Sequence, residues 1–466
     1  MPVSVAGIRR EFRPMLHLAA PLAVAELGWV AMGIVDIVMA GPLGAAAVGT
    51  TSLGGMVFYP IAICGTGMLL GMDTLVAQAF GSGDGDDCRR TLVNGVWLGS
   101  ALAPVLALVL WALIPVLGAA GVNPRVMALM GPFLGNLLWG VWPLLLYAAF
   151  RRYLQAENIV KPVTFALVSA NLVNAAGNWA LMFGHGGAPA MGVAGSALAT
   201  SLARAYMAAV LAAAILWRER QAGYRLWHIA WRPDWARIRR LAGLGLPAAG
   251  QILFEGAVFG IVTTMAARLD EASLAAHGIA VNVISTTYMV PLGISSAAAV
   301  RVGQACGRRD IRAAAVAGWT ALLVSSLVMG AAGLALSLAP GWIVRLYIRD
   351  AAVVSCGTVL LRIAAVFELF DGLQTVATGA LRGLGDTRTP MLAHLAGYWA
   401  VGLPVAYVLC FPLGWGAPGI WVGLSAALIP IGSALVLVWR RAIRTAMPPS
   451  DPPAWRGVPA ATPPAA

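Results

Sequence analysis

Charged side chains are scarce in this sequence. Only 11% of its residues are Asp, Glu, Lys or Arg, whereas a soluble domain carries roughly 25%. Cysteine is also scarce, and the five cysteines form no Cys-x-x-Cys pair and have no histidine at the spacing of a metal site. These absences argue against a soluble fold, a disulfide framework and a structural metal site. We therefore expect free thiols and no cofactor.

Long apolar runs fill the chain instead. Hydrophobic residues make up 60% of the 466 positions, and a membrane-spanning helix needs about 20 mostly apolar residues. The runs predict an all-α polytopic membrane protein with twelve transmembrane helices. Their approximate ranges are 14–40, 50–79, 91–119, 127–150, 162–184, 191–218, 241–268, 275–301, 313–340, 351–379, 390–413 and 417–439. The first run is too long for the apolar core of a signal peptide, so we expect it to remain as a helix.

The breaks between the apolar runs contain, in alternation along the chain, many basic residues and few. The net charge is +12, but the arginines stand between apolar runs, so positive loops on the cytoplasmic side explain them better than a nucleic-acid surface does. The basic residues of the breaks that have few are Arg125, Arg268, Arg345 and Arg349. This alternation predicts that both termini are cytoplasmic and that nucleic acid is not a partner.

The second half repeats the first at an offset of about 227 residues. Three matched segments occur in the same order: Gly33-Ile34-Val35 with Gly260-Ile261-Val262, Gln78-Ala79-Phe80-Gly81 with Gln304-Ala305-Cys306-Gly307, and Gly192-Val193 with Gly419-Ile420. Six helices in each copy predict two lobes of the same orientation with a cavity between them. The expected organisation is an amino-terminal lobe over 1–217, a cytoplasmic linker over 218–240, a carboxyl-terminal lobe over 241–445 and a disordered tail over 446–466.

Several polar side chains fall inside the predicted spans of the first half. An ionisable group in the hydrocarbon layer costs several kcal/mol, which makes it a candidate for function. Asp36 is the main acidic candidate, and Asn174 and Asn178 lie on one face of their helix, where their amides could complete an oxygen-lined cation site. Secondary candidates are Glu26, Asp73 and Asn171.

The second half has its own polar group. Glu255 and Asp371 are the main candidates for cation or proton binding in this half. Secondary candidates are Asn282, Phe367, Glu368 and Gln374. Glu368 and Asp371 are three residues apart on one helix, so both cannot easily be ionised in a dry site.

All of these residues have a structural alternative. Amides and carboxyls also join helices by hydrogen bonds, and Arg204 or Arg362 could pair with an acid and hold helices together. Both readings stay open from the sequence.

Five ordered segments resemble the multidrug and toxic compound extrusion (MATE) transporters, in particular the NorM-like bacterial branch. They are Met32-Gly33-Ile34-Val35-Asp36, Val76-Ala77-Gln78-Ala79-Phe80-Gly81, Gly245-Leu246-Pro247 with Glu255, Met289-Val290-Pro291-Leu292-Gly293, and Phe370-Asp371-Gly372-Leu373-Gln374. The resemblance extends from Pro21 to about Arg441. It implies a V-shaped pair of six-helix lobes in the bacterial inner membrane that alternate access between its two sides.

The family's functional positions can be placed residue by residue. The resemblance implies that Asp36 with Asn174 and Asn178 forms a proton or cation cluster. It also implies that Glu255 and Asp371 form a second cation site, which could hold Na⁺. Two departures bear on the coupling ion. Phe367 stands where a tyrosine is frequent, which removes a possible Na⁺ ligand, and Glu26 stands where an amide is more usual, which favours protons.

The expected function is secondary active antiport, in which cationic amphipathic compounds leave the cell as Na⁺ or H⁺ enters. The internal repeat lets a single chain form the whole cavity, and lipid surrounds it. The main alternative is a flippase for lipid-linked precursors, but such a cavity would need several basic residues for pyrophosphate. A membrane-embedded enzyme would need a nucleophile with its base, or a metal cluster, and no ordered set of this kind occurs. A channel or a purely structural protein also remains open.

Overall fold

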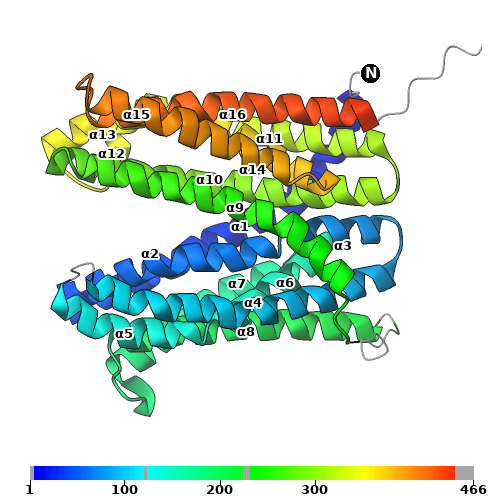
Figure 1. Cartoon of the computed structure of the whole chain (residues 1–466), viewed down its shortest axis with the longest axis horizontal. Helices are drawn as coiled ribbons and strands as arrows, with labels where there is room; N and C mark the ends of the chain where they lie inside the picture. Colours follow the sequence, from blue (N-terminus) through cyan, green and yellow to red (C-terminus); the bar gives the residue numbers. More distant parts are fainter. Residues whose placement is uncertain (1–4, 120–122, 222, 224–230, 447–466) are drawn as a thin grey trace, which may run out of the picture.

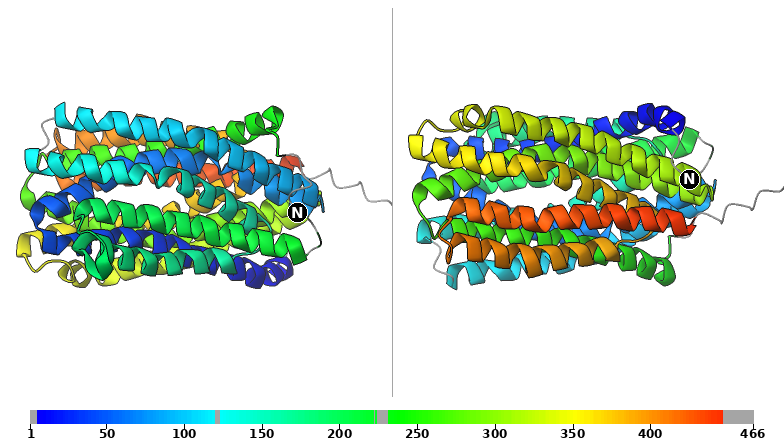
Figure 2. Two further views of the ribbon diagram at one scale, coloured as in Figure 1. Left: turned by 90° about the horizontal axis from the view of Figure 1, so that it is seen from below. Right: turned by 90° about the horizontal axis from the view of Figure 1, so that it is seen from above.

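The computed structural model describes residues 5–119, 123–221, 223 and 231–446, and all regular elements in this part are helices. Most run along a common direction (Figures 1 and 2). In the first half they are α1 (Val5–Ala40), α2 (Ala45–Met68), α3 (Gly71–Gly81), α4 (Gly85–Ala119), α5 (Pro124–Leu138), α6 (Val141–Ala156), α7 (Lys161–Phe183) and α8 (Val193–Gln221), with the short turns η1 (Gly41–Leu43) and η2 (His185–Gly187). In the second half they are α9 (Trp235–Ala266), α10 (Glu271–Gly307), α11 (Ile311–Leu338), α12 (Pro340–Arg345), α13 (Ala351–Leu384), α14 (Arg388–His394), η4 (Leu395–Gly402), α15 (Leu403–Cys410) and α16 (Ala417–Ala446).

The helices are long enough to cross a membrane repeatedly. Ten spans among the described residues pass tests of length and hydropathy, and the bent pair α5 and α6 makes an eleventh. The remaining long helix is α7, with 23 residues, whose three asparagines lower its hydropathy. With α7 counted, the long helices of the described residues number twelve, as the sequence predicts. Parts of the predicted linker, residues 222 and 224–230, and the predicted tail beyond Ala446 lie outside the described residues.

Two helices predicted as continuous are in fact broken. The range 50–79 divides into α2 and α3 at Leu69 and Leu70, and the range 127–150 bends by 42° between α5 and α6. The second break has a local cause, because in a straight helix the ring of Pro143 would clash with the carbonyl four residues earlier, at Trp139. The π-helical segment η4 likewise precedes a proline, Pro404.

Aspartates cap several helices in the second half. The side chains of Asp270, Asp310 and Asp350 accept hydrogen bonds from backbone N–H groups in the first turns of α10, α11 and α13. These bonds satisfy amides that have no partner inside the helix. In the exposed turn before α10, the backbone N–H of Ser273 holds the pKa of Asp270 below its ordinary value.

The apolar side chains form two cores, one for each half of the chain. One core gathers side chains of α2 to α8, and the other gathers side chains of α9 to α16. Two helices cross between them. The first part of α1, through Met15 and Leu22, belongs to the second core, and Leu241 at the start of α9 belongs to the first. Figure 1 shows the two groups of helices one above the other, with α9 running diagonally between them.

We call the end of the bundle where α3, α6, α10 and α13 finish the arginine-rich end. It carries Arg89, Arg151, Arg308 and Arg382 and lies to the right in Figure 1. The side-chain bonds that join the two halves gather here, as in the pairing of Arg301 with Glu11 at 2.7 Å. The arginine-rich end is therefore the closed end of this conformation.

Candidate cation and proton sites

In the first half, Asp36 belongs to a closed ring of hydrogen bonds. Asn178 donates to Asp36 Oδ1 at 2.7 Å, and the hydroxyl of Thr200 donates to Asp36 Oδ2 at 2.9 Å. Asn174 completes the ring, because its amide donates to Thr200 at 3.2 Å and its oxygen accepts from Asn178 at 3.4 Å. Three helices, α1, α7 and α8, thus meet at one carboxylate. The structure brings together the three residues predicted for this site and adds Thr200.

One acceptor atom of this ring takes no part in its hydrogen bonds. Asn178 Oδ1 is buried and has no hydrogen-bond partner among the described residues. Arg204 lies one helical turn after Thr200, but it forms no ion pair in the described part of the chain. Its guanidinium stands over the ring of Phe58 at 4.2 Å, and its Nε and Nη1 atoms have no partner there. Among the described residues Asp36 therefore forms no ion pair, and an amide oxygen without a protein partner lies in the same ring.

In the second half, Gln374 bridges the two predicted carboxylates. Its amide nitrogen donates to Asp371 Oδ1 at 2.9 Å and to Glu255 Oε1 at 3.4 Å. Gln374 Oε1 is buried without a partner among the described residues. Glu255 comes from α9, and the other two come from α13, where spacings of three residues place them on one face. The arrangement parallels the first half, because in the described part of the chain carboxylates without an ion pair again lie beside an amide oxygen without a partner.

Glu368 and Phe367 point to other neighbours. Glu368 is fully buried, accepts a hydrogen bond from Thr287 at 2.9 Å, and leaves Oε2 without a partner in the described residues. The ring of Phe367 stacks on Trp421 with centroids 5.8 Å apart. Both are therefore held by the packing between α10, α13 and α16 rather than by the Gln374 bridge.

Two other predicted candidates are engaged by arginines. Glu26 forms an ion pair with Arg151 of α6. Asp73, which is 1% exposed, lies between Arg152 at 3.2 Å and Arg382 at 3.6 Å. The sequence pattern does not reveal these pairs, because it places the arginines between apolar runs, whereas α6 and α13 bring them within reach of the acids. These contacts connect neither Glu26 nor Asp73 to Asp36.

Asn171 and Asn282 serve local contacts. Asn171 donates to the backbone oxygen of Gly28 at 3.0 Å and so joins α7 to α1. Asn282 accepts from the hydroxyl of Tyr347 at 3.0 Å on an exposed surface. Asn171 therefore continues the asparagine stripe without contacting the carboxylate of Asp36.

Two residues near these sites were not predicted. Thr200 contacts Asp36 directly, and the buried Tyr398 of η4 lies within electrostatic reach of Glu255 and Asp371. Hydroxyls are frequent in membrane helices, so neither residue stands out in the sequence. The π-helical geometry around Tyr398 is a weak signal, since such segments often occur at functional sites.

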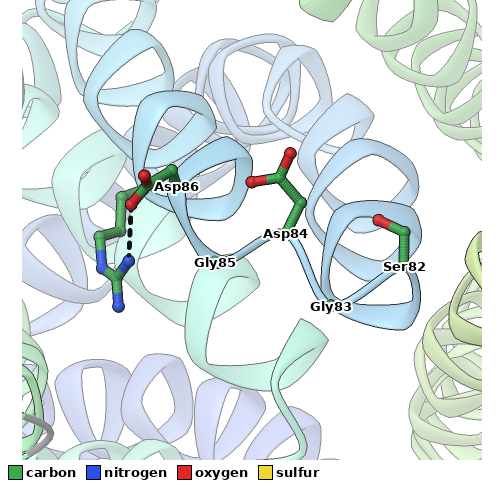
Figure 3. A pocket seen from close by; sticks show the side chains of 6 residues that line it. Ser82, Gly83, Asp84, Gly85 and Asp86 are labelled. Atoms are coloured by element: carbon green, nitrogen blue, oxygen red, sulfur yellow. Dashed lines mark hydrogen bonds and ion pairs between the residues drawn. The ribbon is translucent and has the colours of Figure 1, made fainter.

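A small cavity lies apart from both sites, in the turn between α3 and α4 at the arginine-rich end. It is lined by Ser82, Gly83, Asp84, Gly85, Asp86 and Arg89 (Figure 3). Arg89 pairs with Asp86 at 3.0 Å and with Glu219 at 2.6 Å. The pair with Asp86 lies within α4 and the pair with Glu219 ties α4 to α8, so the cavity belongs to the surface of the closed end.

Long apolar helices in two halves, with buried carboxylates that form no ion pair in the described part of the chain, define a polytopic membrane protein. The sequence matches the MatE family over residues 21–180 and 247–408, one segment in each half. The chain belongs to this family, whose members are transporters and not enzymes. The resemblance predicted from its motifs is therefore confirmed.

Relatives cover nearly the whole chain. The probable multidrug resistance protein NorM of Mesorhizobium japonicum is 37% identical over 447 residues, which cover 94% of this chain and 96% of the relative. The protein of the same name from Pseudomonas aeruginosa is 35% identical, with 93% and 90% covered. These names support the NorM-like branch.

Solved structures show the same fold. The eukaryotic MATE transporter AtDTX14 superposes with a TM-score of 0.85 at 20% identity, over 94% of this chain and 99% of that one. An outward-facing MATE family transporter of the MOP superfamily also gives 0.85 at 18% identity, over 93% and 96%. A Pyrococcus furiosus transporter described as having a binding pocket of reversed polarity gives 0.84 at 18% identity, over 93% and 96%. Pocket chemistry therefore varies on one fold, so the function must be argued from the site.

Proposed function

We propose that this chain is a multidrug efflux antiporter that exports cationic amphipathic compounds in exchange for Na⁺ or H⁺. The observation that carries the proposal is the matched pair of sites. Asp36 and the Glu255 and Asp371 pair are free of basic partners at ion-pair distance in the described part of the chain, and each stands beside an unused amide oxygen. A buried carboxylate with a spare oxygen ligand suits a proton or a small cation. The multidrug resistance names of the relatives support the same class.

The proposed cycle follows from charge. A proton or cation entering from outside neutralises Asp36 or the paired acids, which weakens their hold on a bound cationic compound and favours its release. One inward charge at a membrane potential of about 100 mV supplies about 2.3 kcal/mol. A cationic drug that leaves carries its own charge outward against the same potential, so a one-for-one exchange is driven by the chemical gradient of the ion alone. The potential shifts the drug gradient nearly fifty-fold only when one further charge enters for each drug exported.

Orientation follows from the same arginines that mark the closed end. Basic loops favour the cytoplasm, so we place the arginine-rich end inside and the opposite end outside. In this orientation the described conformation is closed toward the cytoplasm. The start of α1 and the end of α16 then lie on the cytoplasmic side.

The charge of the buried groups disfavours the flippase alternative. A pyrophosphate substrate would call for several unpaired basic side chains. Arg151, Arg152 and Arg382 instead engage Glu26 and Asp73. The acids left unpaired are the ones that a cation would neutralise.

The test is dye export from vesicles under imposed Na⁺ or pH jumps. Asp36→Asn and Asp371→Asn preserve side-chain size but cannot release or take up a proton. We expect each variant to insert at the parental level and to lose most ethidium export. Parental export by both variants would refute the proposal, and comparing the two gradients identifies the coupling ion.

A further inference from the structure

The repeated motif Gln-Ala-x-Gly has no part in the sites described above, yet the fold brings its two copies together. Gln78 and Gly81 end α3 in the first half, and Gln304 and Gly307 end α10 in the second. A Cβ on Gly81 would overlap the backbone carbonyl of Gln304, and a Cβ on Gly307 would overlap that of Gln78. Each glycine thus admits the backbone of the opposite copy, which no other residue would allow at this approach.

The two glutamines make reciprocal hydrogen bonds across the same contact. Gln78 Nε2 donates to the backbone oxygen of Gly383 at 3.1 Å, and Gln304 Nε2 donates to that of Ala156 at 2.8 Å. Ala156 is the last residue of α6, and Gly383 lies in the last turn of α13. The last four backbone carbonyls of a helix have no N–H donor within their own helix. Each glutamine therefore caps a helix that belongs to the other half.

We propose that Gln78 and Gln304 are the positioning pair that closes the arginine-rich end and so sets which side of the membrane the transporter faces. Separating the halves at this end breaks both bonds together and leaves both helix termini uncapped. The pair acts on access, not on ion or drug binding, because neither glutamine is bonded to the carboxylate sites. The repeat explains its symmetry, since each glutamine occupies the same place in its own half.

We call this glutamine pair, with the contact that it closes, the gate. Labelling of a thiol tests the gate and does not require transport. In a full-length variant without the native cysteines, Ala77→Cys places a thiol at a fully buried position against Gly303 of the other half. A membrane-impermeant maleimide is applied to each side of oriented vesicles. We expect slow labelling in the parent, about five-fold faster labelling from the arginine-rich side in Gln78→Leu and in Gln304→Leu, and about 25-fold faster labelling in the double variant.

A matched control is available at the same end. Gln155 is fully buried, and its amide has no partner among the described residues, so Gln155→Leu removes a buried amide but no bond between the halves. We expect parental labelling. Should the reporter at position 77 prevent folding, native Cys306, half-buried beside Gly307, serves as the reporter after the other four cysteines are replaced.

The outcomes separate cleanly. Faster labelling from the arginine-rich side alone, equal for the two glutamines and absent in Gln155→Leu, supports the gate. Unchanged labelling, an effect from only one glutamine, faster labelling from both sides, or an equal effect in Gln155→Leu would overturn it. Only the role of the gate in transport rests on the proposed antiport. If the parent exports no drug but shows the expected labelling pattern, the antiport is refuted and the gate is not.

Discussion

Replacing Thr200 with valine gives a direct test of how the site in the first half binds its ion. Valine has nearly the same shape, so Thr200→Val removes only the hydroxyl. That hydroxyl donates to Asp36 Oδ2 at 2.9 Å and accepts from Asn174 at 3.2 Å. After the change the carboxylate keeps a single hydrogen bond, from Asn178, and the Asn174 amide loses its acceptor.

The size of the effect follows from the bond that is lost. A hydrogen bond to a charged group contributes about 1.5–3 kcal/mol, which corresponds to a change of about 10- to 100-fold in an equilibrium constant. The sign depends on the coupling ion. If protons drive export, a less stabilised carboxylate binds a proton more tightly, and half-maximal export needs a lower proton concentration. If Na⁺ drives export, an oxygen ligand is lost, and half-maximal export needs more Na⁺.

The assay is dye export from vesicles titrated with Na⁺ at fixed pH and with protons at fixed Na⁺. Thr200→Ser keeps the hydroxyl and should behave like the parent. Thr320→Val in α11 is the matched control, because Thr320 is also buried but its hydroxyl has no partner among the described residues. A half-saturation point that stays within about two-fold of the parent in both titrations of Thr200→Val would refute our reading of the ring.

Three further outcomes follow from the contacts. Gln374→Leu removes the amide that bridges the two carboxylates of the second half, so we expect weaker cation-driven export with normal insertion, measured in the same vesicles; parental half-saturation would contradict this. Asp73→Asn leaves two buried guanidiniums without their acid and should lower the free energy of unfolding by about 3–5 kcal/mol, seen as a lower melting temperature in detergent; unchanged melting would contradict it. His277 accepts from Trp421 Nε1 at 3.2 Å through Nδ1 and contacts Thr263 through Nε2 at 3.0 Å. An indole N–H only donates, so Nδ1 of His277 must accept and the ring is neutral. We therefore expect His277→Phe to lower the melting temperature and to leave the pH profile of export unchanged. A shifted profile would assign the ring a role in proton transfer.

Most of the fold could be predicted from the sequence because the membrane imposes a simple rule. Backbone groups in hydrocarbon must be satisfied within helices, so apolar runs of sufficient length identify the spans. Even α7, whose three asparagines reduce its hydropathy, was found from the breaks around it. The breaks at Leu69 and Trp139 were missed, because an apolar run looks the same whether its helix is straight or bent.

The residues of the candidate sites were also largely predictable. A carboxylate inside an apolar run is conspicuous, and this was enough to identify Asp36, Glu255 and Asp371. The sequence could not tell which acids are paired. Glu26 and Asp73 meet arginines that lie more than 70 positions away along the chain, whereas Asp36 does not.

The sequence by itself determined the number of helices, the repeat and the buried acids, because each depends on local composition and period. Only the tertiary structure decided the pairing of Asp73, the place of Thr200 beside Asp36, and the meeting of the two Gln-Ala-x-Gly copies. These contacts join segments far apart in the chain. Their formation depends on how the two halves pack together, which no local pattern records.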